Sequence, residues 1–362
     1  MKQWKWAAVA ASCAVVLAGC GGASDGSNTT PKTVAPSVKV FGDSIMDSGT
    51  FGYKFTIQSA DATKPFLIFP EIVAANFGVS NLCSFFRFNG TTFVPNTACT
   101  SFAVGGGRVN NLTNASAPSN SVPFSITYQM TVGSATLAPT DVVIVDGGGN
   151  DLADLTGAYL GATTPAGIAT YMSLLGTLLP PATVSAIIGS TPTATSMGTA
   201  AGAYAQAIGS TLAASVKTNV VAKGVSKVIV VNSPDITVTP RFAAVLSAVA
   251  AAGGTAQRDA VQGAVRAWTA AFNASLAAGK LPTNSPAADL IQQIEKAACR
   301  AADLTRQMLA YSGKGKFVVE PVDLSRLVQE MASLLRASMS KKAVLEYDFA
   351  PELPLIEADA TQ

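Results

Sequence analysis

Unbroken runs of apolar, mostly β-branched residues recur along the chain, separated by longer stretches with helical spacing. The run at 141–146 is apolar between its two terminal aspartates, which is typical of a central parallel strand covered on both faces. Similar but less uniformly apolar runs predict strands at 38–41, 100–104 and 226–231. Strands that alternate with helices indicate an α/β fold with a doubly wound parallel sheet.

Helical spacing of apolar residues fills the segments between and after these strands. It predicts helices near 70–77, 151–179, 197–223 and 256–278. The last of these helices carries a stripe of large apolar side chains, which we expect to pack in the core: Val261, Val265, Trp268 and Phe272.

The first twenty residues have the pattern of an export signal. Lys2 and Lys5 precede an apolar stretch that is too short to span a bilayer as a helix. The sequence Leu-Ala-Gly-Cys ending at Cys20 resembles a bacterial lipoprotein box and implies lipidation of Cys20, with an ordinary signal peptide as the alternative. Residues 21–37, rich in Gly, Ser, Thr and Pro, are expected to form a flexible linker. The sequence thus predicts a protein of the bacterial cell envelope, lipid-anchored in the membrane or secreted.

Composition and charge fit a folded, exported domain. Hydrophobic residues make up 49% of the chain and charged residues 13%, enough to bury a substantial core. The formal net charge is only +2, and the absence of a basic block excludes a nucleic-acid partner. Outside the cytoplasm, Cys83 and Cys99 either form a disulfide or remain two buried thiols, and Cys299 is left without a partner.

The first candidate catalytic residues follow the strand at 38–41. Gly42, Asp43 and Ser44 lie where α/β proteins build sites, at the carboxyl end of a strand. We expect a helix to begin just after Ser44. The free N–H groups at the start of that helix would favour an anion formed nearby. Taken alone, however, the tripeptide is better explained as an ordinary capped turn.

Two later apolar runs also end in glycine-rich loops. One leads into Gly105, Gly106 and Gly107, and the other into three glycines followed by Asn150 and Asp151. The carboxyl ends of parallel strands meet at one edge of a sheet. The three loops are therefore expected to converge.

In this order, the three motifs resemble those of the GDSL, or SGNH, family of serine hydrolases, particularly its bacterial lipoprotein members. The resemblance covers residues 38–284 and implies a three-layer α/β/α flavodoxin-like fold. It also implies hydrolysis of a small ester or lipid through an acyl-Ser44 intermediate, with Gly106 and Asn150 in the oxyanion hole and no metal or cofactor. The family's fourth motif, Asp-x-x-His, is absent, because the chain contains no histidine. The domain is therefore expected to be truncated and to lack its native last strand.

The missing histidine leaves the proton acceptor open. A carboxylate, with a reference pKa of about 4, is a poor base for a serine hydroxyl. We expect Asp43 and Asp47 to anchor the loop around Ser44, and Asp151 to cap the following helix. Ser24 matches Gly-x-Ser-x-Gly in the linker but has neither the preceding strand nor the following helix that this motif requires. The interpretation is a weakened esterase; the alternative is a catalytically dead lipoprotein of the same fold that binds acyl or glycan ligands.

Residues 285–362 differ in character from the rest, since nearly half of all charged residues lie in this last fifth of the chain. The stretch 301–313 resembles the second dimerisation helix of sensor histidine kinases, and 322–335 and 351–362 resemble the beginning of their ATP-binding domain. Neither a phosphoacceptor histidine nor a nucleotide motif is present, so we expect a mostly helical, non-functional extension and no signalling activity. A strand-like run at 315–320 could replace the missing strand at the sheet edge.

Overall fold

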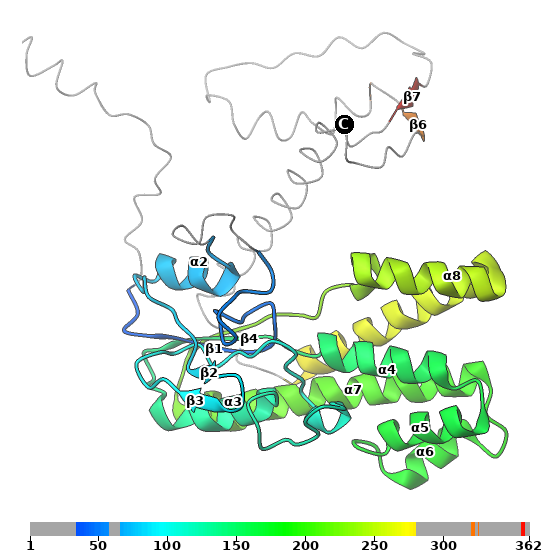
Figure 1. Cartoon of the computed structure of the whole chain (residues 1–362), viewed down its shortest axis with the longest axis horizontal. Coiled ribbons are helices and arrows are strands. Elements are labelled where there is room, and N and C mark those ends of the chain that lie inside the picture. Colours follow the sequence, from blue (N-terminus) through cyan, green and yellow to red (C-terminus); the bar gives the residue numbers. More distant parts are fainter. Residues whose placement is uncertain (1–33, 58–65, 280–319, 323–324, 326–355, 359–362) are drawn as a thin grey trace, which may run out of the picture. The chain divides into compact units, whose positions relative to one another are not determined.

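The computed structural model describes five stretches of the chain (Figure 1), namely residues 34–57, 66–279, 320–322, 325 and 356–358. The chain divides into two compact units, Met1–Pro282 and Thr283–Gln362. The predicted signal peptide, the candidate lipidation site Cys20 and Ser24 lie outside the described residues. Within the described part, no helix combines the length and apolarity needed to cross a membrane.

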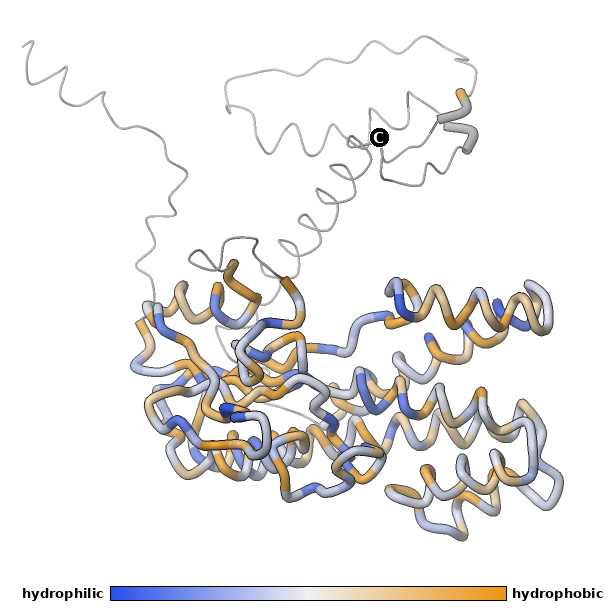
Figure 2. Tube along the Cα trace, in the orientation of Figure 1, coloured by the Kyte–Doolittle hydropathy of each residue, from blue (hydrophilic) through white to orange (hydrophobic). Residues whose placement is uncertain are grey.

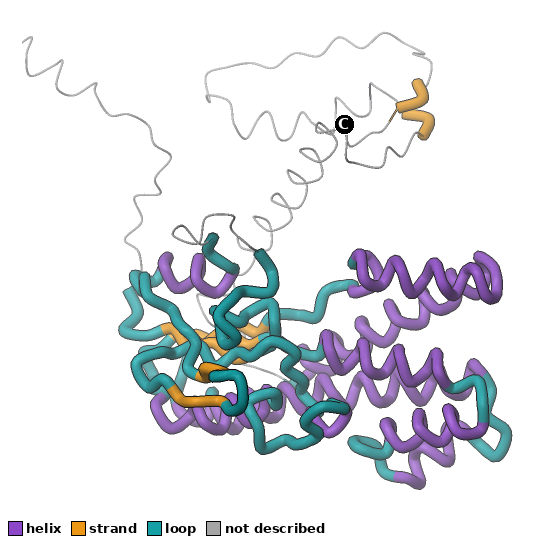
Figure 3. Tube along the Cα trace, in the orientation of Figure 1, coloured by secondary structure: helices purple, strands orange, loops and turns teal. Residues whose placement is uncertain are grey.

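A three-stranded parallel sheet forms the centre of the first unit. It contains β1 (Val38–Phe41), β4 (Val142–Val145) and β5 (Lys227–Val230), in the order β1-β4-β5. The mixed α/β class is therefore confirmed, although the sheet is small and helices make up most of the described unit (Figure 3).

The three strands differ in burial. All residues of β1 and β4 are buried, as expected for strands covered on both faces. The run in β4 is wholly apolar, whereas β1 also buries Lys39. In β5 only Ile229 is fully buried, and β5 pairs only with β4 among the described strands.

The strand expected at 100–104 is not a regular one. Ser101 forms isolated parallel bridges with Val40 and Ser84, and the chain runs beside β1 through hydrogen bonds such as that from Phe102 N to Val40 O, at 2.7 Å. The segment therefore extends the sheet beyond β1 through backbone bonds, without the continuous ladder of a strand.

Helices cover both faces of the sheet. In Figure 1, α2 (Phe69–Asn76) lies on one side of the strands, and α3 (Ile126–Gly133) lies on the other together with α7 (Ala194–Asn219). A side chain at Gly133 would collide with the ring of Phe41, so α3 approaches β1 closely.

The helix expected at 151–179 is divided into α4 (Gly149–Gly161) and α5 (Pro165–Leu175). The first helix ends at Gly161, and Thr164 caps the second, its hydroxyl accepting a hydrogen bond from Gly167 N at 3.1 Å. A shorter helix, α6 (Pro181–Ile188), follows.

The final helix, α8 (Pro240–Ala278), is longer than the sequence predicts. Gly254 interrupts it with φ +81° and ψ 176°, and the chain folds back there into a helical hairpin (Figure 1). The predicted stripe lies on the second half, and all four of its side chains are buried. Apolar and polar residues alternate along these helices (Figure 2), which is the amphipathic pattern that buries one face.

The remaining regular elements are short. An antiparallel hairpin of β2 (Phe86–Phe88) and β3 (Phe93–Pro95) lies between Cys83 and Cys99, which form a disulfide. Four 3₁₀ turns complete the first unit: η1 (Asn111–Thr113), η2 (Ser134–Thr136), η3 (Val221–Lys223) and η4 (Ile236–Val238).

In the second unit, β6 (Glu320–Val322) pairs antiparallel with β7 (Ile356–Ala358). Of the run at 315–320, only Glu320 is described, and it pairs with Ala358 in this separate sheet. The idea that this run replaces a strand of the parallel sheet is thus wrong for its one described residue. The kinase-like stretch 301–313 lies outside the described residues.

Candidate active site

The Gly42–Asp43 turn at the end of β1 is fixed by buried side chains. Gly42 N donates to Gln129 Oε1 at 2.8 Å, and Gln129 Nε2 returns a hydrogen bond to Gly42 O at 3.0 Å. Asp43 N donates to Asp146 Oδ1 at 3.0 Å. A Cβ at position 42 would collide with that same oxygen of Asp146, so glycine is required here for steric reasons.

No helix begins at Ser44, which corrects the sequence-based expectation. Residues 44–46 form a turn in which the Asp43 carboxylate accepts a hydrogen bond from Ile45 N at 3.0 Å. Asp47 then accepts hydrogen bonds from Gly49 N and Thr50 N with the same oxygen. These local side-chain bonds satisfy the backbone in a turn geometry and so compete with a helix. A helix dipole therefore does not contribute at Ser44.

Asp47 also joins the Ser44 turn to the glycine loop. Its second oxygen accepts a hydrogen bond from Gly105 N at 2.7 Å. Burial raises the pKa of Asp47, and the hydrogen bonds from Thr50, Gly49 and Gly105 oppose that rise. This is the anchoring role that the sequence indicates.

The glycine loop presses against the turn that carries Ser44. A Cβ on Gly107 would lie 2.8 Å from Gly42 O, and Val104 N donates to the same carbonyl at 3.1 Å. Gly106 adopts φ +81°, a left-handed conformation that favours glycine. Within the described part of the chain, the backbone N–H groups of Ser44 and Gly106 have no hydrogen-bond acceptor. Two unpaired donors near a serine are what an oxyanion hole requires.

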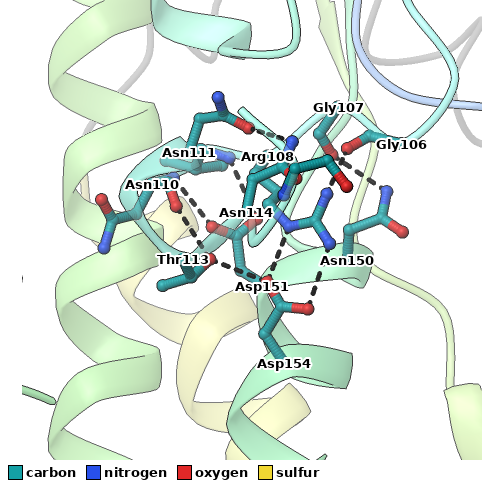
Figure 4. A network of polar contacts seen from close by, with 12 residues as sticks. Gly106, Gly107, Arg108, Asn110, Asn111, Thr113, Asn114, Asn150, Asp151 and Asp154 are labelled. Atoms are coloured by element: carbon teal, nitrogen blue, oxygen red, sulfur yellow. Dashed lines mark hydrogen bonds and ion pairs between the residues drawn. The ribbon is translucent and has the colours of Figure 1, made fainter. Parts of the chain in front are cut away.

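Asn150 lies in the first turn of α4 with its amide directed at the glycine loop (Figure 4). Its Nδ2 donates to Gly107 O at 2.9 Å and lies 3.5 Å from Asp43 Oδ2. Gly148, which precedes the helix, has φ +94°, and a side chain there would meet the ring of Phe272 on α8. Gly148 therefore allows α8 to pack directly against the loop.

Asp151 does not cap its own helix, contrary to expectation. It accepts hydrogen bonds from Val109 N at 3.0 Å and Asn110 N at 2.8 Å, so it joins α4 to the chain beyond the glycine loop (Figure 4). Burial raises the pKa of Asp151 to about 6. An ion pair between Arg108 Nε and Asp154 Oδ2, at 2.6 Å, reinforces the same connection.

A pair of buried aspartates lies at the end of the sheet. Asp43 and Asp146 are each 4% exposed, and their carboxyl groups share a hydrogen bond. Burial and the neighbouring Asp43 carboxylate raise the pKa of Asp146 well above its usual value, and burial also raises the pKa of Asp43. Two such groups cannot both ionise readily, so a single proton shared by the pair is favoured over two carboxylates. Sequence reasoning missed Asp146, although an acid directly after an apolar central strand was a usable signal.

A pocket of about 630 Å³ opens beside this pair. Ser44 and Asn150 both line it, together with Asp43 and Asp146. Gly106 is not among the lining residues; it lies one position from Gly107, whose carbonyl binds Asn150. The structure thus brings Ser44 and Asn150 to one cavity, whereas Gly106 does not line it.

The opposite wall of the pocket comes from the loop after β5 and from the start of α8. The Asn273 side chain binds the Ser233 backbone twice: Oδ1 accepts from Ser233 N at 2.9 Å, and Nδ2 donates to Ser233 O at 3.0 Å. Arg266 pairs with Asp235 at 2.8 Å in the same region. Although burial opposes the change, hydrogen bonds from Thr237 and Arg266 lower the pKa of Asp235.

Among the described residues, no group of three or more acidic, cysteine or histidine side chains is placed to hold a metal ion. No protein-family model matches the chain, and a search of the curated proteins found no match. The functional interpretation therefore depends on the motifs and on the geometry of this pocket.

Proposed function

We propose that residues 38–284 form a truncated GDSL/SGNH-type serine hydrolase that cleaves carboxylic esters through an acyl-Ser44 intermediate. The observation that carries the proposal is that Ser44 and Asn150, far apart in the sequence, line one pocket. In the proposed fold, the small parallel sheet is the remainder of a three-layer flavodoxin-like domain whose last native strand is missing. The half-exposed β5 supports this reading.

In the proposed reaction, Ser44 Oγ attacks the ester carbonyl and the negative charge develops on the carbonyl oxygen. The backbone N–H groups of Ser44 and Gly106 and the Asn150 amide would stabilise this oxyanion. Their support is that both backbone N–H groups lack an acceptor in the described chain. The uncharged Asn150 amide donates to Gly107 O in this structure, so it would turn from that carbonyl to the oxyanion.

The Asp43 carboxylate is the proposed proton acceptor, because it lines the pocket and adjoins Ser44 in sequence. Burial raises its pKa, which makes it a stronger base than an exposed carboxylate. A carboxylate remains a weak substitute for histidine. We therefore expect activity of the order left by a damaged triad, roughly 10³- to 10⁴-fold above water.

The second candidate is a ligand-binding lipoprotein of the same fold without catalysis, which the absence of histidine favours. Both candidates share the same proposed setting: export to the bacterial envelope, lipid anchoring through Cys20, no cofactor and no nucleic-acid partner. We propose no kinase or signalling activity for residues 285–362.

Hydrolysis of short-chain 4-nitrophenyl esters by the full chain tests the proposal. Ser44→Ala is expected to abolish the activity above background. Ser48→Ala is the matched control, because Ser48 lies four positions away and its hydroxyl binds Ser101 Oγ at 3.3 Å instead of lining the pocket. Equal rates for the wild type and Ser44→Ala would refute catalysis by Ser44. A protein that binds fatty acids but hydrolyses no ester would favour the second candidate.

A further inference from the structure

Most of the pocket wall between Ser44 and α8 is apolar. The side chains that make it so come from three separate segments, the Ser44 turn, α4 and the stretch from β5 to α8: Ile45, Ala153, Leu160, Val231, Ile236 and Val245. Such a surface accepts a hydrocarbon chain and discriminates poorly among polar groups. Specificity must therefore come from the few polar side chains that line it.

The end next to Ser44 is acidic. Asp43 and Asp146 both line the pocket there, and the pair keeps a negative charge while it holds one proton. An anionic group on a ligand is repelled from this end, whereas the neutral carbonyl of an ester is not. The acidic pair thus sets the direction in which a charged ligand can enter.

The α8 wall carries a cation without a partner. Arg241, in the first turn of α8, lines the pocket and is exposed, and it makes no ion pair with any described residue. The two other arginines of this helix, Arg258 and Arg266, pair with Asp259 and Asp235. A free guanidinium at the rim of an apolar pocket matches the planar, singly charged carboxylate.

Ser233 supplies a second polar group on the same wall. Ser233 is 5% exposed and lines the pocket, and its hydroxyl has no hydrogen-bond partner in the described chain. The Asn273 amide holds the Ser233 backbone on both sides, so the loop cannot readily move to satisfy that hydroxyl. The oxygen itself is covered, so it meets a ligand only when the Ser233 side chain rotates toward the pocket. A buried hydroxyl without a partner is unfavourable, and a carboxylate in the pocket would therefore favour that rotation.

From these contacts we propose that the pocket takes esters whose acyl chain ends in a carboxylate. Arg241 and Ser233 bind the terminal carboxylate, the apolar wall covers the chain, and the ester carbonyl lies at Ser44. Hydrolysis consumes one water and releases the alcohol and a dicarboxylic acid, so the reaction is the one proposed above. The inference rests on the proposed function for catalysis, but its binding half can be tested separately.

Kinetic discrimination is the first test, using the full chain and two probes with six-carbon acyl groups. We expect kcat/KM for mono-4-nitrophenyl adipate to exceed that for 4-nitrophenyl hexanoate. Arg241→Gln should lower this ratio by about threefold to tenfold, the range expected for losing one partly exposed, charge-assisted contact. Arg258→Gln, on the same helix but away from the pocket, should keep the ratio. An unchanged ratio in Arg241→Gln would overturn the proposal.

Equilibrium binding separates this proposal from the proposed catalysis. In Ser44→Ala, calorimetry should detect binding of monomethyl adipate that is tighter than binding of methyl hexanoate and is weakened by adding Arg241→Gln or Ser233→Ala. Ser84→Ala is the matched control, because Ser84 Oγ is also buried without a partner but does not line the pocket. Binding of monomethyl adipate by a protein that cleaves no ester would refute the catalysis and sustain the carboxylate site. Ester cleavage without tighter binding of monomethyl adipate would do the reverse.

Discussion

The two walls of the pocket differ in how firmly they are held. The strand-end wall combines the Ser44 turn, the glycine loop and the start of α4, and buried side chains bind its backbone at Gly42, Asp43 and Gly105. The facing wall, from the loop after β5 to the start of α8, is half-exposed, and its bonds include the two from Asn273 to Ser233 and the exposed ion pair of Arg266 with Asp235. The strands repeat this contrast, since β1 and β4 are fully buried and β5 is not.

This difference separates the two requirements of the proposed chemistry. The proposed donors for the oxyanion belong to the strand-end wall. Because that wall is firmly held, their backbone dipoles need no reorganisation during the reaction. The proposed substrate groups, Arg241 and Ser233, lie on the weaker wall, next to the edge of β5 where the native last strand is proposed to be missing. Local opening is drawn from regions with few buried contacts. We therefore expect this wall to open before the strand-end wall.

The largest effect on stability is expected from Gly42→Ala, which disturbs the strand-end wall. The new Cβ would collide with the buried carboxyl of Asp146, so the turn must shift. We expect the free energy of unfolding to fall by about 3 kcal/mol or more, measured by urea denaturation. Gly263→Ala in α8 is the control, because nothing lies near its Cβ and alanine favours a helix. It should gain about 0.5–1 kcal/mol. A small loss in Gly42→Ala would contradict the packing of Asp146 against the turn.

The next effect is a pH dependence of stability. The unfolded chain loses the Asp151 proton at a pKa of about 4, whereas the folded chain keeps it up to a pKa of about 6. Between these values the unfolded state binds fewer protons, so the contribution of Asp151 to stability falls as the pH rises. The raised pKa values of Asp43 and Asp146 act in the same direction.

Asp151→Asn should remove the contribution of Asp151 to the pH dependence of the free energy of unfolding, which is about 2–3 kcal/mol between pH 4 and pH 7. The measurement is the free energy of unfolding of both proteins at several pH values in that window. The free energy of unfolding of the wild type minus that of Asp151→Asn should fall as the pH rises. A difference that rises instead would mean that Asp151 is stabilised as the carboxylate.

A smaller, local effect is expected on the weaker wall. Asn273→Ala removes both hydrogen bonds to the Ser233 backbone, and we expect a loss of about 1–2 kcal/mol. In Asn273→Ala, amide hydrogen exchange should speed up, relative to the wild type, more in residues 231–236 than in residues 42–50. Equal changes in both segments would mean that the two walls form one cooperative unit, which would remove the contrast.

The central sheet could be predicted from the sequence almost residue by residue. Unbroken β-branched runs fixed β1, β4 and β5 to within a residue at each end. These runs are informative because burial on both faces leaves little room for polar residues. The helix at 70–77 was displaced by only one residue.

The features that sequence reasoning missed depend on contacts between distant segments. The expected helix after Ser44 is replaced by a turn because Asp43 and Asp47 bond the nearby backbone. Asp146 looked like a strand-end acid, and its pairing with Asp43 arises only when β1 and β4 lie side by side. The first half of α8 is rich in alanine, which carries little periodic signal.

The most direct test of the central claim is covalent trapping of the full chain with a reactive alkylphosphonate ester, followed by peptide mass spectrometry to locate the adduct. The account predicts a single phosphonyl group on Ser44, with no adduct on Ser48 or Ser233. A protein that hydrolyses nitrophenyl esters but carries the adduct on another residue, or carries none, would contradict it.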